Sequence, residues 1–258
     1  MSTQRIIFDF IRSCALKMGV SISWYPPPHS FERHLRDYLA QMRINCVLDV
    51  GAFVGEYAVQ LRRNGYMGSI VSFEPVPASY ALLRQRMQHD ALWRGQPFGL
   101  SDTSGEALMH TGSFNSLLNL HADAEQAYKL DPHLRSEIPI QLRRLEEVLP
   151  ELIKDLDSPR IFMKMDTQGH DVSVLRGVST TLDKIVGFQS ELPTVQIYDG
   201  MPSMSEALAY YRTSGYVPIG FYPVNTFRDM QVSAEFDVLF NRFDGSLAGA
   251  RQSTQVGD

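Results

Sequence analysis

The stretch VLDVGAFVGEYA, residues 47–58, decides the fold of this chain. It begins with an apolar segment, passes through Asp49, Gly51 and Gly55, and continues with helical spacing. Glycine adopts backbone conformations that other residues avoid and lets a ligand approach the main chain closely. A strand that ends in glycines and leads into a helix therefore predicts a ligand site at the carboxyl end of the strand.

Two phosphate-binding motifs begin in the same way, and neither fits. A Walker loop needs a Lys and a Ser or Thr after its last glycine, whereas Gly55 is followed by Glu56 and Tyr57. A dinucleotide fingerprint needs G-x-G-x-x-G, and this chain has only GAFVG, with Glu56 where a pyrophosphate would dock. The stretch therefore favours a ligand that carries a cationic group and no phosphate.

Outward from this stretch, strand and helix patterns alternate along the chain. The predicted strands cover 45–51, 68–75, 96–101, 160–166, 185–192, 216–224 and 235–242. Helical spacing fills most of the segments between them, which predicts an α/β fold: a Rossmann-like, seven-stranded, mostly parallel sheet with helices on both faces. Only a loop joins the last two strands, so antiparallel pairing is expected at that edge.

An acidic residue lies at the carboxyl end of each of the first five predicted strands. These residues are Asp49, Glu74, Asp102, Asp166 and Glu191. Because ligands of parallel sheets bind beyond the carboxyl ends of the strands, we expect these side chains to face one cleft. S-Adenosylmethionine carries a sulfonium and an ammonium group and suits such a cleft.

The second and third strands end in residues suited to the nucleoside part of that ligand. Glu74 is positioned to accept hydrogen bonds from both ribose hydroxyls. Ser101 and Asp102 are both expected in the cofactor site, and Asp102 is positioned to accept a hydrogen bond from the adenine amino group. The alternatives are a surface or helix-capping acid for Glu74 and a simple turn in the SDTSG segment for Asp102.

Composition narrows the class of protein. At 258 residues and 44% hydrophobic content, the chain suits one domain with a sizeable core. A net charge of −5 provides no basic field for a phosphate backbone, which argues against nucleic acid and for a small-molecule or glycan partner. Cys14 and Cys46 form no metal or disulfide pattern, so a reducing, cytoplasmic location is expected. No apolar run reaches the length of about eighteen residues that a transmembrane segment needs.

The N-terminal residues form an extension. Residues 1–20 gather apolar side chains on one side of a predicted helix, and YPPPHS at 25–30 ends it because proline fixes φ and lacks an N–H. We expect this helix to pack on the domain, and the alternative is an anchor on a membrane surface. The predicted divisions are a helical extension and Pro-rich linker over 1–30, the main domain over 31–243, and a flexible tail over 244–258.

Five segments follow one another in the order VLDVGAFVGEYAVQLRRNGYMGSIVSFEPV, FGLSDTSGE, FNSLL, FMKMDTQGHDVSVLRGV and GFQSEL. Together, from about residue 30 to residue 242, they resemble the FkbM family of S-adenosylmethionine-dependent methyltransferases. The resemblance implies the class I methyltransferase fold and O-methyl transfer to a sugar or polyketide hydroxyl, often in bacterial surface-glycan biosynthesis. Because FNSLL stands where the family often has paired serines, the resemblance adds Ser116 to the expected cofactor site.

Several residues depart from the family pattern, among them Asp171 where Glu is common, and three of them bear on function. Phe53 stands where the family usually has Asn, Glu56 where Gln is common, and Asn115 replaces one of the paired serines. These departures motivate a second hypothesis, in which the chain is a catalytically impaired methyltransferase-fold protein that acts in binding or as a scaffold. We expect substrate choice and homodimer contacts in 103–159 and in the N-terminal extension.

Methyl transfer to a hydroxyl calls for a proton acceptor or for a metal that lowers the pKa of the hydroxyl. Asp166 and His170 are the predicted catalytic residues, and the alternative for His170 is capping of the next helix or partly buried packing. In the metal version, Asp166 and Glu191 hold Mg²⁺ against two substrate hydroxyls. Lys164 is interpreted as a snorkelling lysine.

Overall fold

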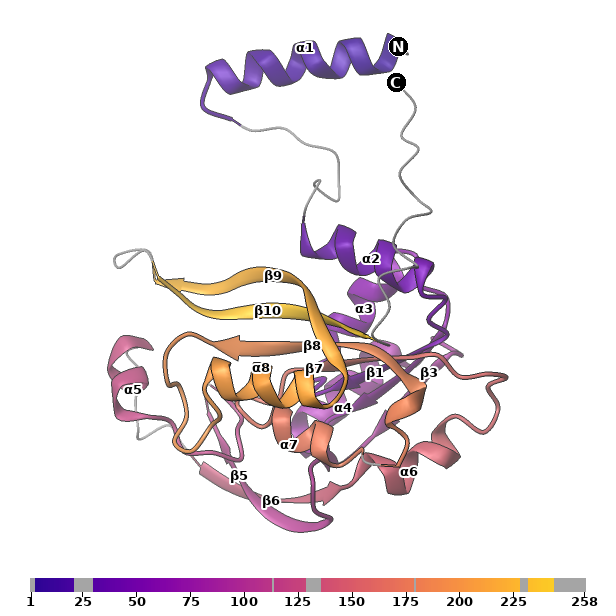
Figure 1. Ribbon diagram of the computed structural model, residues 1–258, viewed down its shortest axis with the longest axis vertical. Helices are drawn as coiled ribbons and strands as arrows, with labels where there is room; N and C mark the ends of the chain where they lie inside the picture. The colour runs from indigo at the N-terminus through magenta and orange to yellow at the C-terminus, as the bar shows by residue number, and fades with distance from the viewer. Residues whose placement is uncertain are drawn as a thin grey trace.

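The computed structural model describes residues 3–20, 30–112, 114–128, 136–178, 180–227 and 232–243, and a seven-stranded sheet forms its centre (Figure 1). The strand order is β3-β2-β1-β7-β8-β10-β9. The strands are β1 (Cys46–Val50), β2 (Ser69–Phe73), β3 (Trp93–Gln96), β7 (Ile161–Met165), β8 (Ile185–Pro193), β9 (Tyr216–Phe227) and β10 (Val232–Arg242). Neighbours from β3 to β8 pair parallel, whereas β10 pairs antiparallel with β8 and β9. The predicted fold class is confirmed, with the reversed strand β10 lying one position inside the β9 edge.

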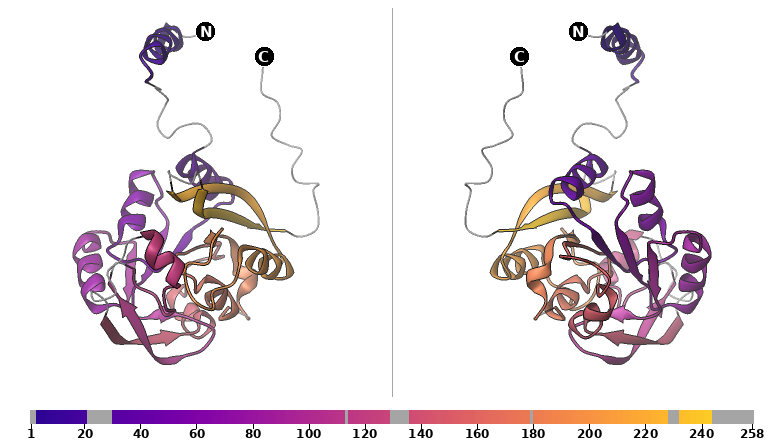
Figure 2. Two further views of the ribbon diagram at one scale, coloured as in Figure 1. Left: turned by 90° about the vertical axis from the view of Figure 1, so that its left-hand side faces the viewer. Right: turned by 90° about the vertical axis from the view of Figure 1, so that its right-hand side faces the viewer.

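Helices cover both faces of this sheet, as Figure 2 shows from two sides. On one face, α2 (Phe31–Gln41), α3 (Glu56–Arg63) and α4 (Pro77–Met87) pack against Val47 and Phe162. On the other, α6 (Leu145–Leu152), α7 (Asp171–Arg176) and α8 (Met204–Thr213) pack against Leu48 and Met163. Successive side chains of a strand point to opposite faces. The mostly apolar character of the central strands therefore follows from burial on both sides.

A second, three-stranded sheet with the order β4-β6-β5 stands beside the first, close to its carboxyl edge. Its strands are β4 (Gly99–Leu100), β5 (Gly105–Thr111) and β6 (Ser136–Arg143), and α5 (Ala122–Tyr128) follows β5. The predicted single strand over 96–101 is wrong, because β3 ends at Gln96 and β4 belongs to the smaller sheet. Pro97, which cannot donate a ladder hydrogen bond, separates the two strands.

The N-terminal helix α1 (Thr3–Lys17) lies apart from the α/β domain in Figure 1. Its large apolar side chains Ile7, Phe10, Ile11 and Leu16 are exposed. The prediction that this helix packs on the domain is therefore wrong. Most of the YPPPHS segment and all of 244–258 lie outside the described residues. No helix in the described part of the chain is long and apolar enough to cross a membrane.

Candidate active site

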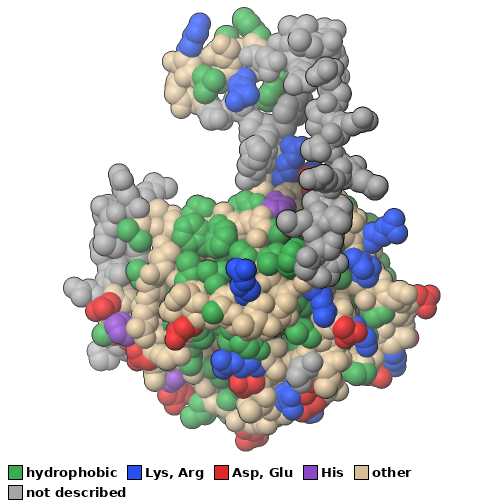
Figure 3. Space-filling model, viewed as in Figure 1, with side chains coloured by type: hydrophobic (Ala, Val, Ile, Leu, Met, Phe, Trp, Pro, Cys, Tyr) green, Lys and Arg blue, Asp and Glu red, His purple; other side chains and the backbone are tan. Residues whose placement is uncertain are grey.

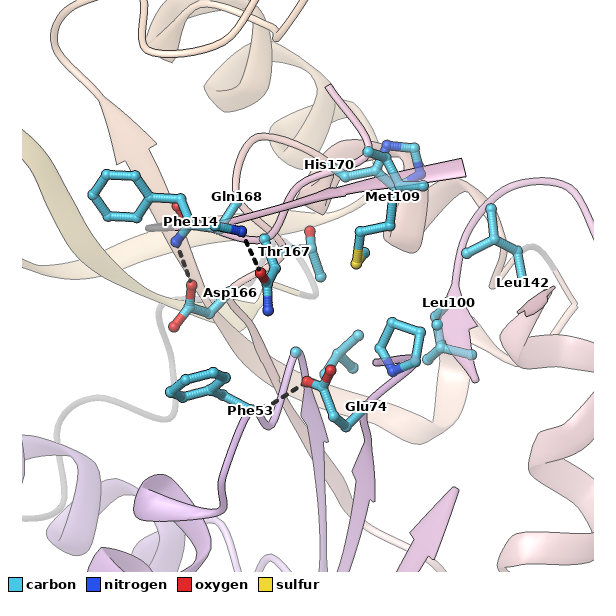
Figure 4. A pocket seen from close by; sticks show the side chains of 17 residues that line it. Phe53, Glu74, Leu100, Met109, Phe114, Leu142, Asp166, Thr167, Gln168 and His170 are labelled. Atoms are coloured by element: carbon cyan, nitrogen blue, oxygen red, sulfur yellow. Dashed lines mark hydrogen bonds between the residues drawn. The ribbon is translucent and has the colours of Figure 1, made fainter. Parts of the chain in front are cut away.

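A cavity of about 300 Å³ opens at the carboxyl ends of β1, β2 and β7 and is walled on one side by the small sheet. Figure 4 shows it from close by. Four of the predicted site residues line it: Gly51, Glu74, Asp166 and His170. An apolar wall faces them, formed by Pro75, Leu100, Met109, Leu117 and Leu142. The size and the mixed lining suit a small organic ligand.

The backbone requires glycine at both Gly51, which lines the cavity, and Gly55, which does not. Gly51 has φ +76°, and a Cβ built there would lie 2.0 Å from the carbonyl oxygen of Asp166. Gly55 has φ +86° at the N-terminus of α3, where a Cβ would lie 2.7 Å from Leu83. Only glycine fits either place without displacing a neighbour. Gly51 allows the ends of β1 and β7 to approach each other, and Gly55 allows α3 to begin.

Glu74 lies on the cavity floor at the end of β2. Its Oε2 accepts from the Phe53 N–H at 2.8 Å, and its Oε1 accepts from the Val76 N–H at 2.9 Å. Burial raises the pKa of Glu74 to about 7, although the two backbone donors oppose that shift. Each carboxylate oxygen keeps a further lone pair for a hydroxyl donor in the cavity. The residue therefore fits a vicinal diol such as a ribose.

Asp49 lies beneath the cavity instead of lining it. The carboxyl group is fully buried, and its Oδ2 accepts from the Ser72 hydroxyl at 3.1 Å. Trp93 in turn donates its indole N–H to the Ser72 hydroxyl at 3.0 Å. Burial raises the pKa of Asp49. Asp49 therefore supports the floor from below.

Lys164 links Asp49 beneath the cavity to Asp166 at its edge, a role that was not predicted from the sequence. The side chain is buried, and its Nζ donates to the Gly51 carbonyl at 3.1 Å. The same Nζ lies 3.5 Å from Asp49 Oδ1 and 3.3 Å from Asp166 Oδ2. Although burial lowers the pKa of the Lys164 ammonium, the two carboxylates more than compensate and raise it. The interpretation as a snorkelling lysine is wrong, because the ammonium is buried and paired with two carboxylates instead of reaching water.

Asp166 is the carboxylate that the cavity exposes, with 40% of its side chain accessible. Gln168 donates its amide N–H to Asp166 Oδ1 at 2.9 Å and to Glu191 Oε2 at 3.4 Å, and its Oε1 accepts from the Tyr198 hydroxyl. Burial, followed by the charge of Asp166, raises the pKa of Glu191 well above its ordinary value. An amide –NH₂ thus stands between the two carboxylates that were predicted to hold Mg²⁺.

This arrangement does not fit the predicted metal. A cation would require both carboxylates to turn their oxygens toward one point, and the Gln168 amide already bridges them as a donor. Among the described residues, no group of three or more His, Cys, Asp or Glu side chains is arranged to hold a metal ion. Asp166 and Glu191 therefore do not offer the set of oxygen ligands that the predicted Mg²⁺ site needs.

His170 lies across the cavity from Asp166, on the side of the small sheet (Figure 4). Its Nε2 is 2.9 Å from the Ser101 hydroxyl, which donates to Asp102 Oδ1 at 3.2 Å. Burial lowers the pKa of His170 and thereby favours the neutral imidazole, although Asp102 opposes that shift. His170 occupies the N-cap position of α7, but its side chain makes no capping hydrogen bond there. Of the two alternatives for His170, the structure shows the partly buried packing and not the side-chain cap. The structure therefore joins three of the predicted residues into one chain of hydrogen bonds.

Ser116 ties a loop to the main sheet. Its buried hydroxyl donates to the Gln168 carbonyl at 2.8 Å and accepts from the Leu118 N–H at 3.0 Å. The neighbouring side chains of Phe114 and Asn115 line the cavity. Ser116 thus holds these two in place and does not itself line the cavity.

Phe53 and Phe114 lie on either side of Asp166 at the cavity mouth (Figure 4). Phe53 is 54% exposed and has a φ of +49°, and the Phe114 ring packs edge-on against Tyr128 with the ring centroids 5.5 Å apart. Sequence reasoning noted Phe53 only as a departure from a family pattern. Its position in a loop gave no periodic signal for a role at the mouth.

Solved structures with low sequence identity share parts of this architecture. An rRNA methylase from Streptococcus thermophilus is 12% identical with a TM-score of 0.44, covering 84% of this chain and 99% of that chain. A precorrin-6y C5,15-methyltransferase from Geobacter metallireducens is 11% identical with a TM-score of 0.43, covering 81% and 88%. A Streptococcus mutans protein in complex with SAH is 10% identical with a TM-score of 0.41, covering 82% and 97%.

No curated protein matches the sequence. The family model described as the methyltransferase FkbM domain matches residues 49–218, more than half of the chain. This range begins at Asp49 and contains every residue discussed above as part of the cavity floor. The chain therefore belongs to the FkbM methyltransferase family, whose chemistry is S-adenosylmethionine-dependent methyl transfer.

Proposed function

We propose that this protein transfers a methyl group from S-adenosylmethionine to a hydroxyl of a sugar, glycan or natural-product acceptor, with Asp166 as the proton acceptor. The observation that carries the proposal is the separation of two carboxylates in one cavity. Glu74 is buried and held by two backbone donors, whereas Asp166 is exposed at the mouth. Glu74 suits a cofactor held in one position, and Asp166 suits an acceptor that enters and leaves the cavity.

The cofactor half of the cavity fits a nucleoside. Glu74 accepts the ribose hydroxyls in this proposal, and the chain of His170, Ser101 and Asp102 meets the adenine edge. Leu100 and Leu142 supply an apolar surface for the base. When bound, the cofactor supplies a methyl group already activated by the sulfonium.

The acceptor half contains the groups that a hydroxyl needs. With the methyl donor bound, Asp166 would take the proton of the acceptor hydroxyl as the acceptor oxygen gains the methyl group. Lys164 at 3.3 Å and Gln168 at 2.9 Å hold the Asp166 carboxylate in one orientation for this step. Phe53 and Phe114 offer apolar faces to a sugar ring or a flat natural product.

Charge and cysteine content bear on the class of acceptor and on the compartment in which the protein acts. A net charge of −5 favours a small-molecule or glycan acceptor over nucleic acid, and cysteines without a disulfide pattern favour the cytoplasm. The competing function is a scaffold that binds the cofactor without turnover. Phe53, which occupies the mouth where the family usually has Asn, is the observation that favours it.

Two measurements test the proposal in sequence. Calorimetric titration with S-adenosylhomocysteine should show binding to the wild type, weakened binding to Glu74→Ala, and unchanged binding to Glu106→Ala on the exposed face of the small sheet. Equal affinity for wild type and Glu74→Ala would remove the ribose assignment. Transfer of labelled methyl to a panel of sugar nucleotides and lipid-linked glycans then separates the enzyme from the scaffold, since binding without transfer to any acceptor supports the scaffold.

A further inference from the structure

An apolar stripe runs along α1. Ile7, Phe10, Ile11, Cys14 and Met18 follow the spacing i, i+3, i+4, i+7 and i+11, which places them on one side of a helix and of the turn that follows it. The fractional exposure is 55% for Ile7, 70% for Phe10, 48% for Ile11 and 74% for Met18, and Cys14 is also exposed. Leu16, at 56%, lies on the opposite side of the helix.

This exposure distinguishes α1 from the next helix. In α2, the apolar side chains Leu35, Tyr38 and Leu39 are all buried against the sheet. A contiguous apolar face that a soluble domain leaves in water marks a surface for interaction. The α1 stripe therefore calls for a partner outside the domain.

The charge of the segment identifies the chemistry of that partner. Residues 1–20 contain Arg5, Arg12 and Lys17 against the single acid Asp9, a balance of +2. The whole chain carries −5, so residues 21–258 carry −7. Arg12 and Lys17 are exposed, and Figure 3 shows basic and hydrophobic side chains together on α1. A positive, amphipathic helix on an acidic protein complements an anionic surface.

We propose that α1 docks on the surface of an anionic lipid bilayer, with its apolar stripe in the interface and its basic side chains toward the headgroups. Its fifteen residues are too few to cross a hydrocarbon core of about 30 Å at about 1.5 Å per residue, so the helix lies in the plane of the surface. The sequence shortly after α1 holds Trp24 and Tyr25, residue types enriched at membrane–water interfaces. This inference is independent of the acceptor that the domain methylates.

Vesicle sedimentation of the full chain tests this proposal. The wild type should sediment with phosphatidylcholine vesicles that contain phosphatidylglycerol, and much less with phosphatidylcholine alone. The double variant Phe10→Ser/Ile11→Ser should lose at least about tenfold in vesicle affinity. Leu16→Ser is the control for position on the helix, because it removes an exposed apolar side chain from the other side and should leave the affinity unchanged. Arg12→Glu/Lys17→Glu should abolish the preference for anionic vesicles.

Two further readouts keep the outcomes separate. Binding of S-adenosylhomocysteine should be equal in all these variants, which shows that the domain is folded whether or not methyl transfer is ever found. Failure of the wild type to sediment, or equal losses in Phe10→Ser/Ile11→Ser and Leu16→Ser, overturns the proposal. A dimer in light scattering that only the stripe variant dissolves, without vesicle binding, also overturns it and assigns the stripe to a second copy of the chain.

Discussion

Lys164 Nζ lies 3.3 Å from Asp166 Oδ2, and Lys164 is paired in register with Asp49 on the neighbouring strand β1. One buried cation thus links a carboxylate beneath the cavity to the carboxylate that the cavity exposes. Because a buried charge is costly without a partner, the two acids and the lysine depend on one another. Lys164 therefore contributes both to the stability of the cavity floor and to the proposed chemistry of Asp166 at the cavity mouth.

Replacing Lys164 with Met should destabilise the protein by about 3–5 kcal/mol, because the fully buried Asp49 loses its cation. Urea unfolding measures this loss. Lys154→Met, which breaks only an exposed pair with Glu151, should leave the midpoint unchanged. The double variant Lys164→Met/Asp49→Asn should recover part of the loss, since it removes the uncompensated charge, and a strictly additive loss would contradict the pairing.

The pH dependence of cofactor binding should follow Glu74. Ribose hydroxyls donate to the carboxylate form, and burial raises the pKa of this group to about 7. The affinity for S-adenosylhomocysteine should therefore be fully present above pH 7 and fall as the pH drops through 7, by about tenfold between pH 8 and pH 6. Calorimetry in buffers of different ionisation enthalpy should also detect proton release on binding. Glu74→Gln should bind more weakly and without this pH dependence, and a wild-type affinity equal at pH 6 and pH 8 would contradict the assignment.

Several features of the fold and site were predictable because they are local in the sequence. Glu74 and Asp166 follow buried strands directly, and the parallel topology brings such positions to one edge. The break at Pro97 was not recognised, because a short strand in a second sheet has the same local pattern as one in the first.

The partners of the site residues were beyond the reach of local patterns. The contact of His170 with Ser101 joins positions 69 residues apart. The pairing of Lys164 with Asp49 depends on a strand register that no single segment encodes. A lysine between two methionines in a buried strand was the available signal, and it has meaning only once the neighbouring acid is placed opposite.

Gly51→Ala should be far more harmful than the same change at Gly65. Both glycines have positive φ, so each variant carries a backbone cost of about 1–2 kcal/mol. A Cβ at Gly65 meets open space, whereas one at Gly51 lies 2.0 Å from the Asp166 carbonyl oxygen and must push the β1 and β7 ends apart. Thermal unfolding should show an additional loss of at least about 2 kcal/mol for Gly51→Ala. Equal losses in the two variants would show that the approach of these strand ends is not tight.

Asp166→Asn should separate catalysis from cofactor binding. The amide keeps the shape of the side chain and an oxygen for the Gln168 donor, but it cannot take the acceptor proton. Once an acceptor is found, methyl transfer should fall by about 10²- to 10⁴-fold while the affinity for S-adenosylhomocysteine stays close to that of the wild type. The exposed Asp199→Asn is the matched control and should leave both quantities unchanged. His170→Asn should affect cofactor affinity more than turnover, because His170 contacts Ser101 on the side of the cavity opposite Asp166. The reverse result, full turnover in Asp166→Asn and none in His170→Asn, would transfer the role of base to the histidine.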